Sequence, residues 1–126
     1  MRELDEYMKS YNAANAKNHI VAWIRDWCEK NGNCCTAAVG ISGGKDSSVV
    51  AALCLEALGK DRVFGVLMPN GQQSDIDMAY KLVDHLSIEY CEVNIFSGCN
   101  AIMHSVKEAL DGHWSVQSST NLPARV

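Results

Sequence analysis

The chain has 126 residues, of which 48% are hydrophobic, 21% charged and 7% aromatic, as in an ordinary single globular domain. With 11 Lys and Arg against 15 Asp and Glu, the formal net charge is −4, which argues against binding nucleic acid by bulk phosphate attraction. No apolar run reaches the roughly 18 to 20 residues of a membrane-spanning helix, and the acidic start lacks the apolar core of a signal peptide. We therefore expect a cytoplasmic domain with neither nucleic-acid nor membrane partners.

Six cysteines are distributed along the chain, and no pair has the C-x-x-C spacing of a metal-binding or redox motif. In a cytoplasmic protein of this length they are expected to be reduced thiols rather than a disulfide framework. Most are expected to pack as small buried apolar side chains. The six are Cys28, Cys34, Cys35, Cys54, Cys91 and Cys99.

Apolar periodicity predicts helices that alternate with strands. Ile20, Trp23, Ile24 and Trp27 recur at helical spacing and give residues 17–30 one apolar face. The short apolar run that follows is typical of a parallel strand covered on both faces. The expected elements are a helical lead-in over residues 1–16, helices over 17–30, 49–58, 76–86 and 101–110, strands over 35–41, 62–68 and 88–95, and a polar loop over 111–122. Such alternation predicts an α/β fold built from βαβ units.

Between the first strand and the next helix, residues 40–48 read Gly-Ile-Ser-Gly-Gly-Lys-Asp-Ser-Ser. A glycine-rich turn at the carboxyl end of a parallel strand directs backbone N–H groups and a helix N-terminus at a ligand, which favours anions. The serine hydroxyls can donate to phosphate oxygens. Asp46 would be repelled by such oxygens unless a divalent cation, such as Mg²⁺, lies between them.

The spacing excludes two other phosphate motifs. A Walker A loop needs four residues between its first glycine and Gly-Lys-Ser/Thr, whereas here three separate Gly40 from Gly44 and Asp46 stands at the Ser/Thr position. The glycines also lack the register of Gly-x-Gly-x-x-Gly. The alternative without a ligand is a tight turn that caps the helix, with Asp46 complementing the helix dipole. Glycines, hydroxyls and an acid together at a favoured crevice favour the ligand site.

The string Ser-Gly-Gly-x-Asp-Ser resembles the pyrophosphate loop of the N-type ATP pyrophosphatases. Two further stretches, residues 67–77 and 118–125, make the chain similar to the N-terminal part of the synthetase domain of the NAD synthetases. The resemblance implies a Rossmann-like fold of the adenine nucleotide alpha hydrolase type, a parallel sheet with helices on both faces. It also implies that ATP and Mg²⁺ are used to adenylate the carboxylate of deamido-NAD, with release of pyrophosphate, and that ammonia then displaces AMP to give NAD. The full-length protein would be a homodimer.

The resemblance also assigns roles to individual residues. Asp46 would hold Mg²⁺, and Arg125 would contact deamido-NAD. Lys45 occupies a variable position of the motif, so it would either help the phosphates or face solvent, while the Met68 side chain is expected to pack in the core even if its backbone contacts adenine. No catalytic side chain is assigned. The residues expected to bind ATP are Gly40, Ile41, Ser42, Gly43, Gly44, Lys45, Asp46, Ser47, Ser48, Met68 and Gln73.

The domain of that family continues beyond the segment matched by residues 121–125. We therefore expect residues 1–126 to be a single incomplete domain that binds ATP weakly and is a poor catalyst alone. With no amidase domain before Met1, ammonia would be used in free form. Two alternatives stay open: another adenylating enzyme of the group, of the tRNA-thiolating or lysidine-forming type, and a non-catalytic ATP-binding remnant. The acidic pI disfavours a tRNA partner.

Overall fold

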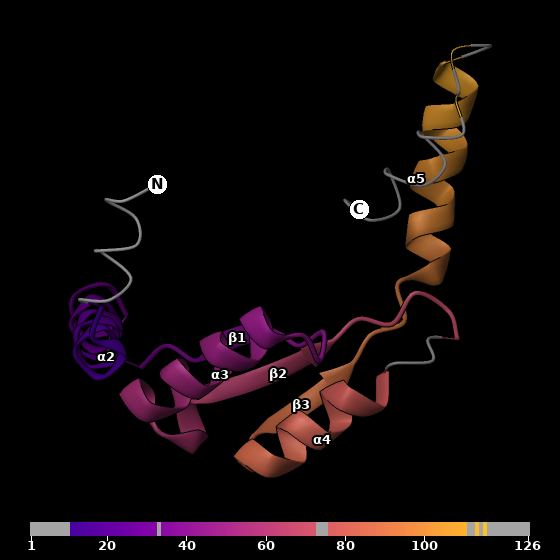
Figure 1. Cartoon of the computed structure of the whole chain (residues 1–126). Coiled ribbons are helices and arrows are strands. Elements are labelled where there is room, and N and C mark those ends of the chain that lie inside the picture. Colours follow the sequence, from indigo (N-terminus) through magenta and orange to yellow (C-terminus); the bar gives the residue numbers. More distant parts are fainter. Residues whose placement is uncertain (1–10, 33, 73–75, 111–112, 114, 116–126) are drawn as a thin grey trace.

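The computed structural model describes residues 11–32, 34–72, 76–110, 113 and 115. Within them, three strands form a sheet and helices connect the strands (Figure 1). The elements are helix α2 (Ala13–Asn31), strand β1 (Ala37–Gly40), helix α3 (Lys45–Leu58), 3₁₀ helix η1 (Lys60–Arg62), strand β2 (Val63–Leu67), helix α4 (Ile76–Leu86), strand β3 (Glu89–Glu92) and helix α5 (Phe96–Ala109). Every predicted helix and strand from residue 17 to residue 110 is present.

The sheet is parallel, in the order β1-β2-β3, which confirms the predicted α/β class. Val39 lies beside Gly65, and Gly65 lies beside Tyr90. Backbone pairing continues past the carboxyl end of β3, where the Val93 amide donates to the Leu67 carbonyl at 2.8 Å and the Ile95 amide to the Pro69 carbonyl at 2.9 Å. The predicted strand over residues 88–95 is longer than β3, and this continued pairing explains the difference at its carboxyl end.

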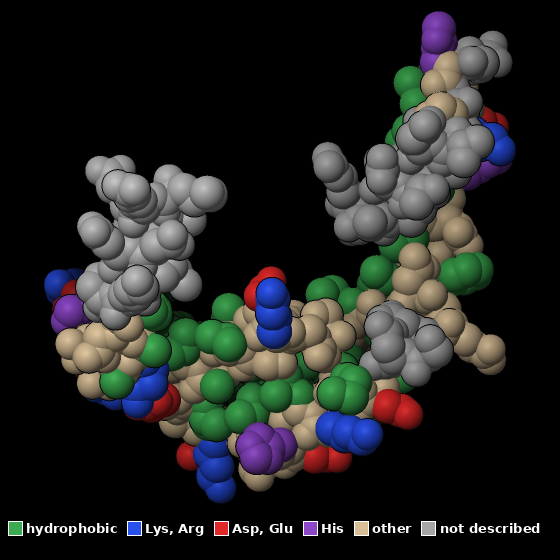
Figure 2. Space-filling view, viewed as in Figure 1, with side chains coloured by type: hydrophobic (Ala, Val, Ile, Leu, Met, Phe, Trp, Pro, Cys, Tyr) green, Lys and Arg blue, Asp and Glu red, His purple; other side chains and the backbone are tan. Residues whose placement is uncertain are grey.

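Helices α3 and α4 pack together on one face of the sheet and enclose the core with it (Figure 1). Strands in sequential order joined by crossovers of one hand place successive helices on the same side. On the opposite face Ala38 is exposed and Phe64 is half-buried, so the second helical layer that the sequence analysis expects is not among the described residues. Hydrophobic side chains gather over α3, α4 and the strands (Figure 2). The buried core comprises Val39, Ile41, Ala51, Val63, Leu67, Ala79, Val83 and Ile88.

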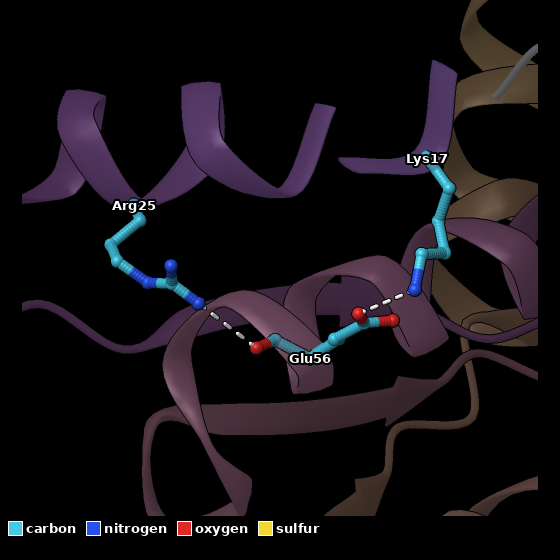
Figure 3. Close-up of polar contacts among 3 residues, drawn as sticks. All are labelled: Lys17, Arg25 and Glu56. Carbon is cyan, nitrogen blue, oxygen red and sulfur yellow. Dashed lines mark hydrogen bonds and ion pairs between the residues drawn. The ribbon is translucent and has the colours of Figure 1, made fainter. Parts of the chain in front are cut away.

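Helix α2 packs along α3 through polar contacts (Figure 3). Arg25 donates from Nε to the Ala57 carbonyl at 3.2 Å and from Nη2 to the Glu56 carbonyl at 3.4 Å, while Lys17 Nζ lies 2.6 Å from Glu56 Oε1. An arginine at this place satisfies carbonyls of the last turn of α3, which have no partner within the helix.

The predicted apolar face of α2 is only partly covered. Val21 and Cys28 are buried, whereas Trp23 is 64% and Trp27 51% exposed. Helical spacing places these side chains near one another on the helix but does not determine how much of the apolar stripe a neighbouring helix covers.

Two helices begin earlier than their apolar periodicity predicts. Helix α3 starts at Lys45 rather than residue 49, and α5 starts at Phe96 rather than residue 101. The first turn of α3 is Lys-Asp-Ser-Ser, which carries no hydrophobic signal, and in α5 the polar and glycine residues Ser97, Gly98 and Asn100 interrupt the apolar pattern around Phe96 and Cys99. Residues 1–10 of the expected lead-in, and all of the expected polar loop except His113 and Ser115, lie outside the described residues. Among the described helices, none has the length and apolar character needed to cross a membrane.

Candidate functional site

The loop from β1 to α3 rests against the beginning of α4, and Gly43 makes this possible. Its φ is +77°, and a Cβ added there would lie 2.9 Å from both the Ala79 amide nitrogen and the Met78 Cβ. A larger residue would have to adopt a disfavoured left-handed conformation and would also push the loop off α4. Gly44 differs, since its φ is −79° and it forms the N-cap of α3.

The serine hydroxyls of the motif hold the loop in shape. Ser42 Oγ lies 3.1 Å from Ser47 Oγ and accepts from the Gly44 amide at 3.3 Å. Ser47 and Ser48 both donate to the Gly44 carbonyl, at 3.1 and 2.7 Å. The serine hydroxyls predicted to bind phosphate are therefore hydrogen-bonded within the loop. A ligand would either compete for these hydroxyls or bind to a loop whose shape they already hold.

The first turn of α3 provides an anion-binding surface. No side chain caps this helix, so the amides of Lys45, Asp46 and Ser47 have no acceptor within it. The helix dipole adds partial positive charge at the same place. Lys45 and Asp46 are both exposed. The described residues contain no group of three or more His, Cys, Asp or Glu able to hold a metal ion, so a cation at Asp46 would need most of its other ligands from a bound molecule and water.

A cavity of about 190 Å³ lies beside the loop at the carboxyl ends of β1 and β2. Its lining is mostly apolar and consists of Gly40, Ile41, Ser42, Leu67, Met68, Pro69, Ile76 and Ala79. Met68 is 50% exposed, and its methyl carbon Cε lies 3.2 Å from where a Cβ on Gly40 would be. The expectation that the Met68 side chain packs in the core is therefore wrong, because residue 68 falls on the sheet face that α3 and α4 do not cover.

Helix α4, which supports the loop, is anchored to β3. The Tyr80 hydroxyl donates a hydrogen bond to the Glu92 carboxylate, and the Tyr80 ring makes an edge contact with Tyr90, with 6.2 Å between ring centroids. The bond to Glu92 is the main reason that the pKa of Tyr80 is raised above its ordinary value. These contacts hold α4, which carries the cavity residues Ile76 and Ala79, against β3.

The structure brings most of the predicted site residues together. Residues 40–48 and Met68 meet at one edge of the sheet, as expected for the carboxyl ends of neighbouring parallel strands. Gln73 and Arg125 lie outside the described residues.

Two contributions to this edge were not predicted from the sequence, namely further cavity-lining residues and the Asn94 side chain. Pro69, Ile76 and Ala79 also line the cavity. Asn94 accepts from the Gly71 amide at 3.2 Å and the Phe96 amide at 3.1 Å, which ties the segment after β2 to the start of α5. An asparagine between a strand and a helix is a capping signal that could have indicated this role.

Comparison with known proteins identifies the family. A chain from Methanosarcina mazei called NH(3)-dependent NAD(+) synthetase is 42% identical over 98 residues, which are 75% of this chain and 38% of that protein. The structure is similar to that of the NH3-dependent NAD synthetase of Campylobacter jejuni in complex with nitrate, with a TM-score of 0.73 and 27% identity over 91% of this chain and 48% of the other. It is also similar to the glutamine-dependent NAD+ synthetase of Acinetobacter baumannii in complex with ADP, with a TM-score of 0.74 and 26% identity over 86% of this chain and 21% of the other.

The chain thus spans about two fifths of the length of that curated relative, 38% by the alignment. A family model described as NAD synthase matches residues 16–126, which include the loop, the cavity and the whole described sheet. The resemblance drawn from the three motifs is confirmed, and the fold with it. The protein belongs to the NAD synthase family.

Proposed function

We propose that the chain carries the ATP-binding part of an enzyme that converts deamido-NAD to NAD. The proposal rests on the position of the loop of residues 41–44, which leads into the start of α3, where no side chain caps the helix, and lies next to an apolar cavity. Amides and a helix dipole suit a polyphosphate, and the cavity suits an adenine ring. The Acinetobacter relative was solved with ADP, which supports an adenine nucleotide at this site.

The cavity and the loop divide the nucleotide between them. About 190 Å³ is less than the roughly 300–1,000 Å³ of pockets that enclose a whole small molecule, so the cavity takes the base and leaves the phosphates outside. The exposed phosphates would then reach the amides of Lys45, Asp46 and Ser47. Gly40 and Met68 would contact the base, because both line the cavity.

Asp46 fits a magnesium ion in this arrangement. Mg²⁺ in nucleotide sites is commonly held by one or two carboxylates together with phosphate oxygens and water, and Asp46 is an exposed carboxylate on the turn that would face the phosphates. The bound ion would neutralise charge on the departing pyrophosphate. Lys45, exposed on the same turn, would either assist or face solvent.

The reaction that this site would support has two steps. A carboxylate oxygen of deamido-NAD bonds to the α-phosphorus of ATP, and the bond to the pyrophosphate oxygen breaks. Ammonia then adds to the carbonyl carbon of the acyl adenylate, loses a proton, and expels AMP to leave the amide. A carboxylate is a poor acyl donor because its leaving group would be oxide, and adenylation replaces that group with a phosphate monoester. The chain's own residues would act by positioning the anionic reactants and by stabilising charge.

Two further residues of the proposed site, Gln73 and Arg125, lie outside the described residues. Gln73 would contact ATP and Arg125 would contact deamido-NAD through its planar pair of donors. Free ammonia would be the nitrogen donor, in line with the names of the Methanosarcina and Campylobacter relatives, which call those proteins NH3-dependent. The complete enzyme would be a cytoplasmic homodimer.

Calorimetric titration of the 126-residue chain with ATP, with and without Mg²⁺, tests the binding step. We expect weak binding that strengthens with Mg²⁺ and is lost in Asp46→Ala. Asp61→Ala is the matched control, because Asp61 is also an exposed acid in a first helical turn but lies at the other end of the sheet. Equal effects of the two substitutions, or binding indifferent to Mg²⁺, would contradict the proposal.

A hybrid tests the chemical step. Residues 16–126 would replace the matching segment of the Methanosarcina relative, and pyrophosphate release would be followed with deamido-NAD as the varied substrate. We expect release to depend on deamido-NAD and, with ammonia present, to yield one NAD for each pyrophosphate. A hybrid that binds ATP but releases no pyrophosphate when deamido-NAD is added would support a non-catalytic ATP-binding remnant instead.

A further inference from the structure

Two cysteines meet at the amino end of the sheet, opposite the candidate nucleotide site. The Gly32 amide donates to the Cys28 carbonyl at 2.8 Å, and the Cys35 amide donates to the Gly32 carbonyl at 2.8 Å. These bonds turn the chain back on itself, so that Cys35 returns to the last turn of α2, where its thiol interacts electrostatically with the Cys28 thiol. Gly32 leaves room for this return, since a Cβ there would lie 3.2 Å from Cys35 Sγ.

A guanidinium group lies against Cys35. Arg62 donates from Nε to the Cys35 carbonyl at 3.0 Å, and its Nη2 lies 3.9 Å from Cys35 Sγ. A guanidinium in this position places a positive charge beside the Cys35 sulfur. Among the described residues, no cation contacts the exposed Cys34 thiol.

The two thiols differ in the way that distinguishes an attacking from a resolving cysteine. Cys35 is half-buried and reachable from solvent, whereas Cys28 is only 6% exposed. Burial, and next the neighbouring Cys35 thiol, raise the pKa of the Cys28 thiol, so Cys28 is suited to react second, with an oxidised Cys35 beside it. Cys54 lies near enough to Cys28 to interact electrostatically with it, which makes it the competing partner.

We propose that Cys35 and Cys28 form a reversible intramolecular disulfide when the protein meets a hydroperoxide. The Cys35 thiolate attacks one peroxide oxygen, the O–O bond breaks, and the hydroxide that leaves takes up the thiol proton as water, which gives Cys35 sulfenic acid. Cys28 sulfur then attacks the Cys35 sulfur and displaces hydroxide, which leaves as water with the Cys28 proton. The two cysteines lose two electrons in total and the peroxide gains them. A small dithiol reverses the reaction.

The crosslink would join the end of α2 to the segment that leads into β1. Cys35 lies two residues before Ala37, where β1 begins, and the candidate nucleotide loop follows the opposite end of that strand. The disulfide therefore forms without involving any residue of the loop. The proposal does not depend on the proposed function.

Peptide mapping of the peroxide-treated chain tests the pairing. After brief exposure to hydrogen peroxide and alkylation of the remaining thiols, trypsin cleaves after Lys30 and Lys45 and so separates Cys28 from Cys34 and Cys35. We expect one dominant linked pair, peptide 26–30 joined to peptide 31–45, with fragmentation placing the bond on Cys35 and dithiothreitol removing it. A dominant bond to Cys34 or Cys54, an intermolecular dimer, or no linked pair would overturn the proposal.

Three serine variants separate the roles of the cysteines. In Cys28→Ser the reaction should stop at Cys35 sulfenic acid, which dimedone traps as a stable adduct. In Cys35→Ser neither the disulfide nor an adduct on Cys28 should form. Cys34→Ser, which changes the exposed neighbour, should react like the parent chain. Circular dichroism would establish that each variant is folded, and a linked pair that persists in folded Cys35→Ser would refute the assignment.

The contribution of the guanidinium is tested through the reaction rate. Arg62→Gln should slow peroxide consumption by Cys35 several-fold, and Arg62→Lys should restore part of the rate because it keeps the positive charge. Since Arg62 also holds the Cys35 carbonyl, the thermal midpoint of each variant serves as a structural control. Unchanged rates in both folded variants would contradict the role of Arg62.

Discussion

Substitution of Gly43 by alanine is the sharpest test of how the candidate loop is held. At φ +77°, an alanine would incur about 1–2 kcal/mol for the left-handed conformation. Its Cβ would also lie 2.9 Å from the Ala79 backbone nitrogen, and because a backbone atom of a packed helix cannot give way cheaply, overpacking adds about 1–3 kcal/mol. We expect Gly43→Ala to lower the free energy of unfolding by about 2–5 kcal/mol in total.

Two other glycines separate these contributions. Gly44 has an ordinary φ, and its added Cβ would meet only the Ser42 hydroxyl, at 3.3 Å, so Gly44→Ala should lose at most about 1 kcal/mol of capping preference. Gly59 has φ +82° and ψ 162° with open space around it, so Gly59→Ala carries no steric cost and only the backbone cost of its own positive-φ conformation, about 1–3 kcal/mol. Urea denaturation of the three variants gives the comparison. If Gly43→Ala costs no more than Gly44→Ala, the seating of the loop on α4 is not what fixes its shape.

Four further substitutions test the contact between α2 and α3, the support of α4 and the cavity. Arg25→Ala removes two hydrogen bonds to α3 carbonyls and should lower the free energy of unfolding, measured by urea denaturation, by about 1–3 kcal/mol. Lys17→Ala removes only an exposed ion pair and should lower it by less than about 1 kcal/mol. Equal losses would contradict the role of Arg25 in holding α2 against α3. The pKa of Tyr80 is raised in the folded protein, so the contribution of Tyr80 to stability is present below the unfolded pKa near 10 and is lost as pH rises through the folded pKa. Tyr80→Phe should therefore flatten the decrease of the urea midpoint at alkaline pH. An unchanged decrease would exclude Tyr80 as its source. Met68→Ala should leave the free energy of unfolding nearly unchanged, because Met68 is exposed. It should weaken the binding of ATP but not the binding of inorganic triphosphate, and competition calorimetry would measure both. Equal losses for the two ligands would show that Met68 does not contact the base.

Local sequence features predicted the framework of the site. Short apolar runs such as residues 63–67 and the glycine-rich segment after residue 40 are strong signals because burial and positive φ each restrict the residue types that fit. They placed the loop correctly between β1 and α3. The first turn of α3 was missed because its residues serve the loop and so lack an apolar period.

Contacts between residues that are distant in the sequence could not be predicted from local sequence features. The fit of Gly43 against Met78 and Ala79 depends on how α4 packs, and the exposure of Met68 depends on which face of the sheet the helices cover. Trp23 and Trp27 have the spacing of core residues yet lie exposed, because periodicity reports that apolar side chains share a face and not what covers that face.

Backbone amide chemical shifts test the central claim most directly. On addition of Mg²⁺ and ATP to the ¹⁵N-labelled chain, the account predicts that the largest shifts fall on the amides of Gly43, Gly44 and the first turn of α3 from Lys45 to Ser47, with smaller shifts around Met68. A second hollow at the amino end of the sheet, lined in part by Thr36, Lys60 and Asp61, provides the internal comparison. Shifts centred on that hollow, with the first turn of α3 unmoved, would contradict the account.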